Sequence, residues 1–123
     1  MSTVTKVWYI PDAYLASPDL NEPLYKNHEA VCVLNTTETD AQLILDFYFP
    51  DRAPQRDIRI TVPANRCYHI RLDDPAQVGG FVIPFDVPYG IRIQSDVAVV
   101  IQYSRLYATT PNVSVMTTIA YAE

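Results

Sequence analysis

Apolar and polar residues alternate with a period of two through most of this sequence, and this feature constrains the fold more than any other. In the segment QLILDFYF (42–49) every odd-numbered residue is apolar, whereas Gln42, Asp46 and Tyr48 are expected to point toward water or a partner. Successive side chains of an extended strand point to opposite faces, so this period predicts half-buried strands. The segment 56–62 repeats the pattern, and no segment shows a convincing helical period.

β-branched and aromatic residues, which strands favour, dominate these segments. The pattern predicts an all-β fold, an antiparallel two-sheet β-sandwich of about eight strands in a single domain over 1–123. The strands are expected at 6–10, 28–35, 42–49, 56–62, 65–72, 89–94, 97–106 and 113–122. An irregular excursion is expected over 11–27 and a long loop over 73–88, and the link Ser95-Asp96 is expected to join its two strands as a hairpin.

The charge balance narrows the classes of partner. The formal net charge is −5 and there is no Lys/Arg run, which disfavours nucleic-acid binding because that binding depends on cation–phosphate contacts. No signal peptide opens the chain and no apolar stretch reaches ~18 residues, which favours a cytoplasmic location. The two cysteines, Cys32 and Cys67, are far apart and match no metal or redox spacing.

The segment NRCYHIRLDD (65–74) carries an unusual row of polar side chains. In a strand, Cys67, His69 and Arg71 share one face, and the opposite face is mostly apolar behind Arg66. Such a row can be an active site, a ligand-binding surface or a solvated strand face. Asp73 and Asp74, which follow at once, are most simply a turn that ends the strand.

Binding of a small polar ligand, which includes carbohydrates, has the broadest support. Arginine, histidine and glutamine supply planar hydrogen-bonding groups, a tryptophan supplies a flat stacking face, and nine tyrosines add apolar area with a polar tip. The candidate ligand-binding or interface residues are Trp8, His28, Glu29, Arg66, His69, Arg71, Gln94, Gln102 and Arg105. We expect Arg66, His69 and Arg71 to lie opposite a second group, formed by Gln94, Gln102 and Arg105. Gln94 and Gln102 flank the Ser95-Asp96 link and are expected to face each other or lie close across the strand pair.

Metal binding and catalysis are weaker alternatives. The two histidines, His28 and His69, lie in different strands without a metal-ligand spacing, so we predict no metal site and no cofactor. No nucleophile elbow or phosphate-binding glycine loop is present, so we assign no catalytic residue. The alternative function is a small sugar- or anion-processing enzyme that uses His69 with Glu29 or Asp73.

The segment VAVVIQY (97–103) is apolar on both faces. One face of a sandwich strand packs on the core, so the other must be covered by a loop or another chain. This pattern fits a homo-oligomer, in which subunit contacts compete with ligand binding for the same polar residues.

Four segments in this order, HEAVCVLN, TVPANRCYHIRLDD, IQSDVAVVIQYSRL and TTIAYA, with Trp8 ahead of them, resemble the sensory rhodopsin transducer family. The likeness runs from about Trp8 to Ala122. It implies a small cytoplasmic β-sandwich that assembles as a homotetramer, without an established catalytic activity. It also implies a role in relaying a signal from a membrane photoreceptor, another protein partner or a ligand.

Overall fold

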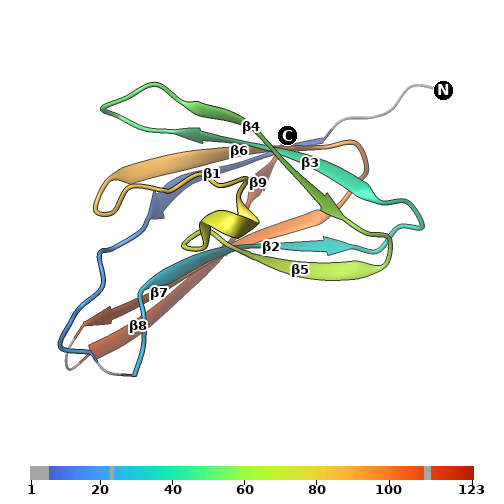
Figure 1. Ribbon diagram of the computed structural model, residues 1–123. Helices are drawn as coiled ribbons and strands as arrows, with labels where there is room; N and C mark the ends of the chain where they lie inside the picture. Colours follow the sequence, from blue (N-terminus) through green and yellow to red (C-terminus); the bar gives the residue numbers. More distant parts are fainter. Residues whose placement is uncertain (1–5, 23, 110–111) are drawn as a thin grey trace.

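The computed structural model describes residues 6–22, 24–109 and 112–123. Within them lie nine strands and one short 3-10 helix: β1 (Lys6–Tyr14), β2 (His28–Asn35), β3 (Ala41–Tyr48), β4 (Gln55–Val62), β5 (Arg66–Arg71), η1 (Pro75–Gln77), β6 (Pro88–Ser95), β7 (Val100–Thr109), β8 (Asn112–Ile119) and β9 (Tyr121–Ala122). The strands form a five-stranded sheet, β4-β3-β6-β1-β9, and a four-stranded sheet, β5-β2-β7-β8. Figure 1 shows the two sheets as stacked layers, which confirms the predicted antiparallel sandwich. No helix in the described part of the chain is long and apolar enough to cross a membrane.

The core lies between the two sheets and is built from the alternating residues. Leu45 and Phe47 of β3 and Ile93 of β6 enter it from the five-stranded sheet, and Val33 and Ile101 enter it from the four-stranded sheet. The period-two pattern therefore identified the faces that become buried. Two sheets that cover each other's apolar faces in this way need no helix.

Asp46 departs from the predicted exposure. It points to the outer side of β3, yet its side chain is only 6% exposed, because Arg56 and Arg92 lie within 3.8 and 3.7 Å of its carboxylate. Asp57 beside it has a left-handed φ of 62°, and the β3–β4 register shifts here. The carboxylate of Asp46 accepts a hydrogen bond from the Asp57 N–H at 3.0 Å, so it supports the backbone of this bulge.

The predicted hairpin around Ser95-Asp96 is wrong. β6 pairs with β1 and β3, whereas β7 pairs with β2 and β8, so the link carries the chain from one sheet to the other. A two-residue hairpin favours a turn with positive φ, and neither residue of this link is among the described positive-φ residues. The Ser95 hydroxyl instead donates to the Val97 carbonyl at 2.7 Å.

Three predicted strands differ from the observed ones by three or more residues at an end, and one of these is β7, which runs over Val100–Thr109 where 97–106 was predicted. β1 continues past Ile10 to Tyr14, so the irregular segment starts later than residue 11. Pro11 is tolerated because it lies at an irregularity, where the register with β6 shifts between Ile10 and Ala13. The last segment, predicted as one strand, divides at the buried Ala120 into β8 of one sheet and β9 of the other.

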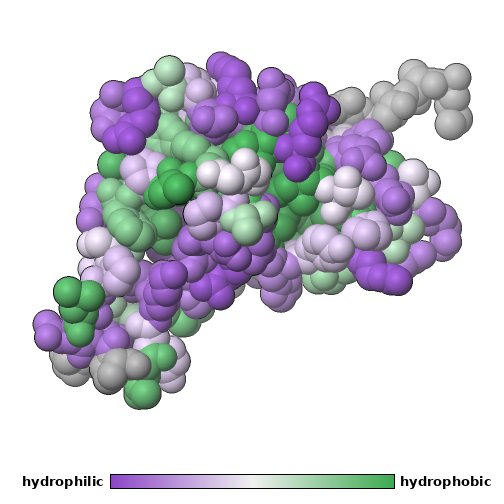
Figure 2. Space-filling model, in the orientation of Figure 1, coloured by the Kyte–Doolittle hydropathy of each residue, from purple (hydrophilic) through white to green (hydrophobic). Residues whose placement is uncertain are grey.

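The long loop after β5 contains η1 and covers one side of the sandwich. Gly79 and Gly80 adopt left-handed φ values of 67° and 84°, which glycine tolerates best. Val78 and Ile83 of this loop are buried in the core. In Figure 2 hydrophobic side chains reach the surface between the layers on this side, and hydrophilic side chains gather below η1.

Candidate functional site

The predicted site residues separate into two main groups, because neighbours along a strand point to opposite faces. Register places His28, His69, Arg71 and Gln102 on the outer face of the four-stranded sheet. Glu29 and Arg105, which are paired across β2 and β7, point to the inner side together with Trp8. Cys67, His69 and Arg71 therefore share one face as predicted, whereas Glu29 and Arg105 lie on the other side of the same sheet.

Glu29 is the centre of the inner group. Its carboxylate is fully buried and accepts hydrogen bonds from the Tyr89 hydroxyl at 2.6 Å, from the Tyr14 N–H at 2.9 Å and from the Tyr103 hydroxyl. Burial raises the pKa of Glu29, against the opposing effect of the hydrogen bonds from Tyr89 and Tyr14 and of the charge of Arg105. Burial, together with the nearby carboxylate, holds the pKa of Tyr89 well above its usual value.

This carboxylate connects the two layers. Tyr14 and Tyr89 belong to the five-stranded sheet, whereas Glu29 and Tyr103 belong to the four-stranded sheet. The arrangement satisfies a buried acid with three donors, as a structural polar network requires. It also fixes the position of the strands around Arg105.

Arg105 lies beside this network, at one end of a cavity. Its guanidinium packs over the Tyr103 ring at 5.8 Å, and its Nη2 lies 3.4 Å from the carboxylate of Asp12. Its Nε is buried and has no hydrogen-bond partner. The cavity has a volume of about 380 Å³ and is lined by Tyr14, Arg105, Tyr107, Ser114, Val115 and Met116.

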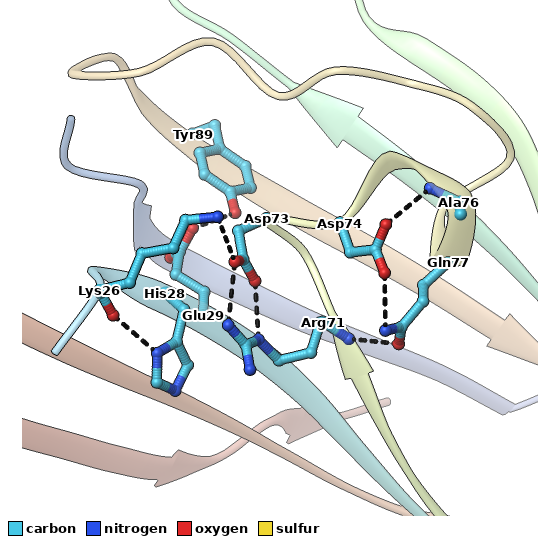
Figure 3. A network of polar contacts seen from close by, with 9 residues as sticks. All are labelled: Lys26, His28, Glu29, Arg71, Asp73, Asp74, Ala76, Gln77 and Tyr89. Atoms are coloured by element: carbon cyan, nitrogen blue, oxygen red, sulfur yellow. Dashed lines mark hydrogen bonds and ion pairs between the residues drawn. The ribbon is translucent and has the colours of Figure 1, made fainter. Parts of the chain in front are cut away.

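Arg71 is held in a separate polar network, shown in Figure 3. It donates two parallel hydrogen bonds to Asp73, at 2.7 and 2.9 Å, and Lys26 lies 3.4 Å from the same carboxylate. Burial raises the pKa of Asp73, but the hydrogen bonds and charge of Arg71 outweigh it and the pKa is lowered. Asp74 caps η1 by accepting from the Ala76 N–H at 3.1 Å, so the two aspartates do end the strand in a turn.

The outer face of the four-stranded sheet is mostly uncharged. His69 lies opposite Cys32, and Cys32 lies opposite Gln102 on its other side. We use "outer face" for the residues that register places there: His28, Ala30, Cys32, Leu34, Cys67, His69, Arg71, Val100, Gln102, Ser104, Leu106, Ala108, Val113, Val115, Thr117 and Ile119. Several of its apolar side chains are exposed, and this is most marked at Val115 (70%), Ile119 (67%) and Val100 (53%).

Three of the predicted ligand-binding or interface residues are not placed to contact a ligand with the others. Trp8 lies in the core, so its ring offers no exposed stacking face. Arg66 stands at the start of β5 and donates to the neighbouring Asn65 carbonyl at 3.0 Å. Gln94 lies on β6 in the other sheet, on the face away from the core, so it does not meet Gln102.

The geometry also bears on the enzyme alternative and on metal binding. His69 points to the outer side of the sheet and Glu29 to the inner side, so the structure does not bring this pair together. The carboxylate of Asp73 forms ion pairs with Arg71 and Lys26, so it is not free to act with His69. Among the described residues no group of three or more His, Cys, Asp or Glu side chains is placed to hold a metal ion.

Sequence reasoning missed Tyr89 and Asp12. Tyr89 alternates with Ile91 and Ile93 and therefore points inward, where its hydroxyl needs a partner. That pattern was a signal for a buried acceptor such as Glu29. Asp12 gave no signal, because its approach to Arg105 depends on how the two sheets are stacked.

The comparisons with known proteins agree with this architecture. Residues 3–122 match the family model described as Anabaena sensory rhodopsin transducer. The crystal structure of Thermotoga maritima 1070 is 31% identical with a TM-score of 0.83, and the match covers 98% of this chain and 96% of that one. The solved structure of the Anabaena sensory rhodopsin transducer is 35% identical with a TM-score of 0.68, and the match covers 80% of this chain and 91% of that one. No curated protein matches the chain in sequence.

Proposed function

Because this chain belongs to the Anabaena sensory rhodopsin transducer family, we propose that it is a cytoplasmic, oligomeric signal-relay protein and not an enzyme. A sensory receptor, such as a membrane rhodopsin, is the partner that the name of the Anabaena relative suggests. Two free cysteines fit a reducing compartment. The relay consists of a change in subunit contacts when the partner binds.

The outer face is the observation that carries this proposal. Val100, Val115 and Ile119 are each more than half exposed, and together with Leu34 they spread over three neighbouring strands. Apolar residues gathered on one sheet face are typical of protein–protein contacts. A face of this kind is expected to be covered in the working protein.

We propose that a second copy of the chain covers the outer face. The face contains no carboxylate, and the charge of Arg71 is already paired with Asp73. Two such faces can therefore meet about a two-fold axis without repulsion between like charges. A homotetramer needs a second contact, for which β8, at the edge of its sheet, is available.

Assembly is tested by light scattering on Val100→Asp and on a matched control, Val82→Asp. Val82 is 68% exposed on the loop after η1 and lies away from the outer face. We expect the native chain and the Val82 variant to be oligomers of one size. The Val100 variant should dissociate, because it places a charge in the apolar contact. A monomeric native chain would contradict the proposed assembly.

The relay itself is tested with a purified sensory rhodopsin in lipid nanodiscs. We expect the native protein to bind the rhodopsin and to alter the decay of its light-activated state. The Val82 variant should behave like the native protein, whereas the Val100 variant should lose the effect if the oligomer is the signalling form. An unchanged rhodopsin at saturating protein would contradict the proposed partner class.

A further inference from the structure

We propose that the cavity between β1 and the ends of β7 and β8 binds a small carboxylate-bearing molecule through the guanidinium of Arg105. This inference goes beyond the relay function, because the assembly argument rests on the outer face and shares only Val115 with the lining of this cavity. It rests on the cavity, on the incomplete hydrogen bonding of Arg105, and on the fact that the neighbouring carboxylate of Glu29 takes its hydrogen bonds from other residues.

The cavity has the size and the lining of a small-molecule site. Its volume of about 380 Å³ lies at the lower end of the range for ligand pockets. Tyr14 and Tyr107 contribute aromatic walls, Met116 an apolar wall and Ser114 a hydroxyl. A second cavity of about 310 Å³, lined in part by Met116 and Asp12, continues it along β1.

Arg105 brings a charge to this cavity without a close partner. Its side chain is only 19% exposed, and its Nε has no acceptor. Nη2 lies 3.3 Å from the main-chain oxygen and 3.4 Å from the carboxylate of Asp12. Charge-assisted hydrogen bonds between guanidinium and carboxylate are normally about 2.7–2.9 Å, so Asp12 pairs with Arg105 poorly.

Glu29 does not supply the missing partner. It stands directly opposite Arg105 in the β2–β7 pairing, but its two oxygens take their hydrogen bonds from Tyr14, Tyr89 and Tyr103. Within the described residues, the ion pair of Arg105 is the one to Asp12, whose side chain is 82% exposed. The mostly buried guanidinium is therefore near the charge of Glu29 but makes its ion pair with the solvated carboxylate of Asp12, at 3.4 Å, which compensates poorly for burial.

The identity of the ligand group follows from the shape of the guanidinium. Nε and Nη2 form a fork that matches the two oxygens of a carboxylate. A ligand carboxylate that displaces Asp12 would accept from Nη2, and also from the buried Nε once the side chains that cover this nitrogen move aside, whereas Asp12 reaches only Nη2. The body of the ligand would lie against Tyr14 and Tyr107, which favours a ring or another flat group.

The surrounding acids limit the charge of the ligand. Asp12 remains at the rim, and Asp86 accepts a hydrogen bond from the Tyr14 hydroxyl at 3.3 Å. A second negative charge on the ligand would be repelled by these carboxylates. We therefore expect monocarboxylates to bind better than dicarboxylates of the same size.

The test is an NMR titration of the native protein that follows the Nε–H signal of Arg105. The probes are benzoate with its neutral analogue benzamide, and glucuronate with its neutral analogue glucose. We expect at least one of the two carboxylates to bind and to move the Nε–H signal downfield, because that hydrogen gains an acceptor. Its neutral analogue should bind at least about tenfold more weakly, the loss expected when a hydrogen bond to a charged group is removed.

Three variants separate a ligand site from a structural ion pair. Arg105→Gln should lose carboxylate binding, and Arg105→Lys should recover little of it because lysine has no fork. Asp12→Asn should strengthen binding about two- to fivefold, because it removes a competing carboxylate. Circular dichroism of each variant establishes that the fold is retained.

Three results would overturn the proposal. The first is that neither carboxylate moves the Nε–H signal at tens of millimolar. The second is that binding persists in a folded Arg105→Gln protein, and the third is that Asp12→Asn weakens it. None of these results would affect light scattering on the Val100 variant, so the failure of the ligand site and of the proposed assembly can be told apart.

Discussion

At the residue scale, Glu29 shows how one buried acid can organise a sandwich. Three donors from both sheets converge on its carboxylate, so it joins the layers while it lies beside Arg105. Burial makes ionisation of this acid unfavourable, and the hydrogen bonds only partly offset the effect. The protonation of Glu29 is therefore linked to folding.

The linkage predicts a pH-dependent difference between the native chain and Glu29→Gln. A raised pKa means that the folded state holds the proton more tightly than the unfolded state, whose pKa is near 4.5. The resulting stabilisation is complete below that pH and is lost as pH rises through the folded value. We expect urea unfolding to show that the native advantage over Glu29→Gln narrows as pH rises from 4 to 8.

The exposed Glu38→Gln serves as the control for the general loss of one carboxylate. A native advantage over Glu29→Gln that widens with pH would contradict the expected direction. That result would mean that Arg105 and the tyrosines favour the ionised form more than burial opposes it.

At the element scale, the β3–β4 bulge depends on Asp46. Its carboxylate faces Arg56 and Arg92 and accepts a hydrogen bond from the Asp57 N–H. Without this carboxylate the Asp57 N–H in β4 would have no acceptor. The left-handed φ of Asp57 follows from the same irregularity. A polar residue on the outer side of a strand is thus a structural part of the sheet.

Asp46→Ala should lower the free energy of unfolding by about 1–3 kcal/mol, because it leaves a partly buried N–H without an acceptor. Asp46→Asn retains an acceptor oxygen and should recover most of the loss. Urea unfolding of both variants, with the exposed Asp51→Ala as a control, measures the effect. An equal loss in both variants would assign the stabilisation to the arginine pairs instead.

Most strands and their buried faces could be predicted from the sequence. Alternation identified the buried faces of β3 and β4 because side-chain direction within a strand is a local property. It could not identify the sheet to which β7 belongs, because that depends on pairing with β2 and β8. The candidate residues Glu29 and Arg105 did come together, whereas Trp8 went to the core because a large apolar ring gains most from burial.

At the scale of the whole molecule, the outer face makes stability a property of the assembly. If copies of the chain cover this face, folding and association are coupled, and the apparent stability depends on protein concentration. The exposed apolar side chains of Val100, Val115 and Ile119 would be buried on association, and their burial would stabilise the folded state.

We therefore expect the melting temperature of the native chain to rise with protein concentration. Val100→Asp should melt at a temperature independent of concentration, whereas Val82→Asp should follow the native chain. Differential scanning calorimetry over a hundredfold range of concentration measures this. A native melting temperature that does not change would argue against assembly coupled to folding.

The order of the strands has a consequence for how quickly the chain folds. Among the seven strand pairings of the described residues, only β3–β4 and β7–β8 join strands that are consecutive in the sequence. The other pairings close long loops before they are stabilised, and proteins dominated by such non-local contacts fold in milliseconds to seconds. Refolding should accordingly be slow for a chain of 123 residues, with the two local hairpins present before β1 is inserted between β6 and β9.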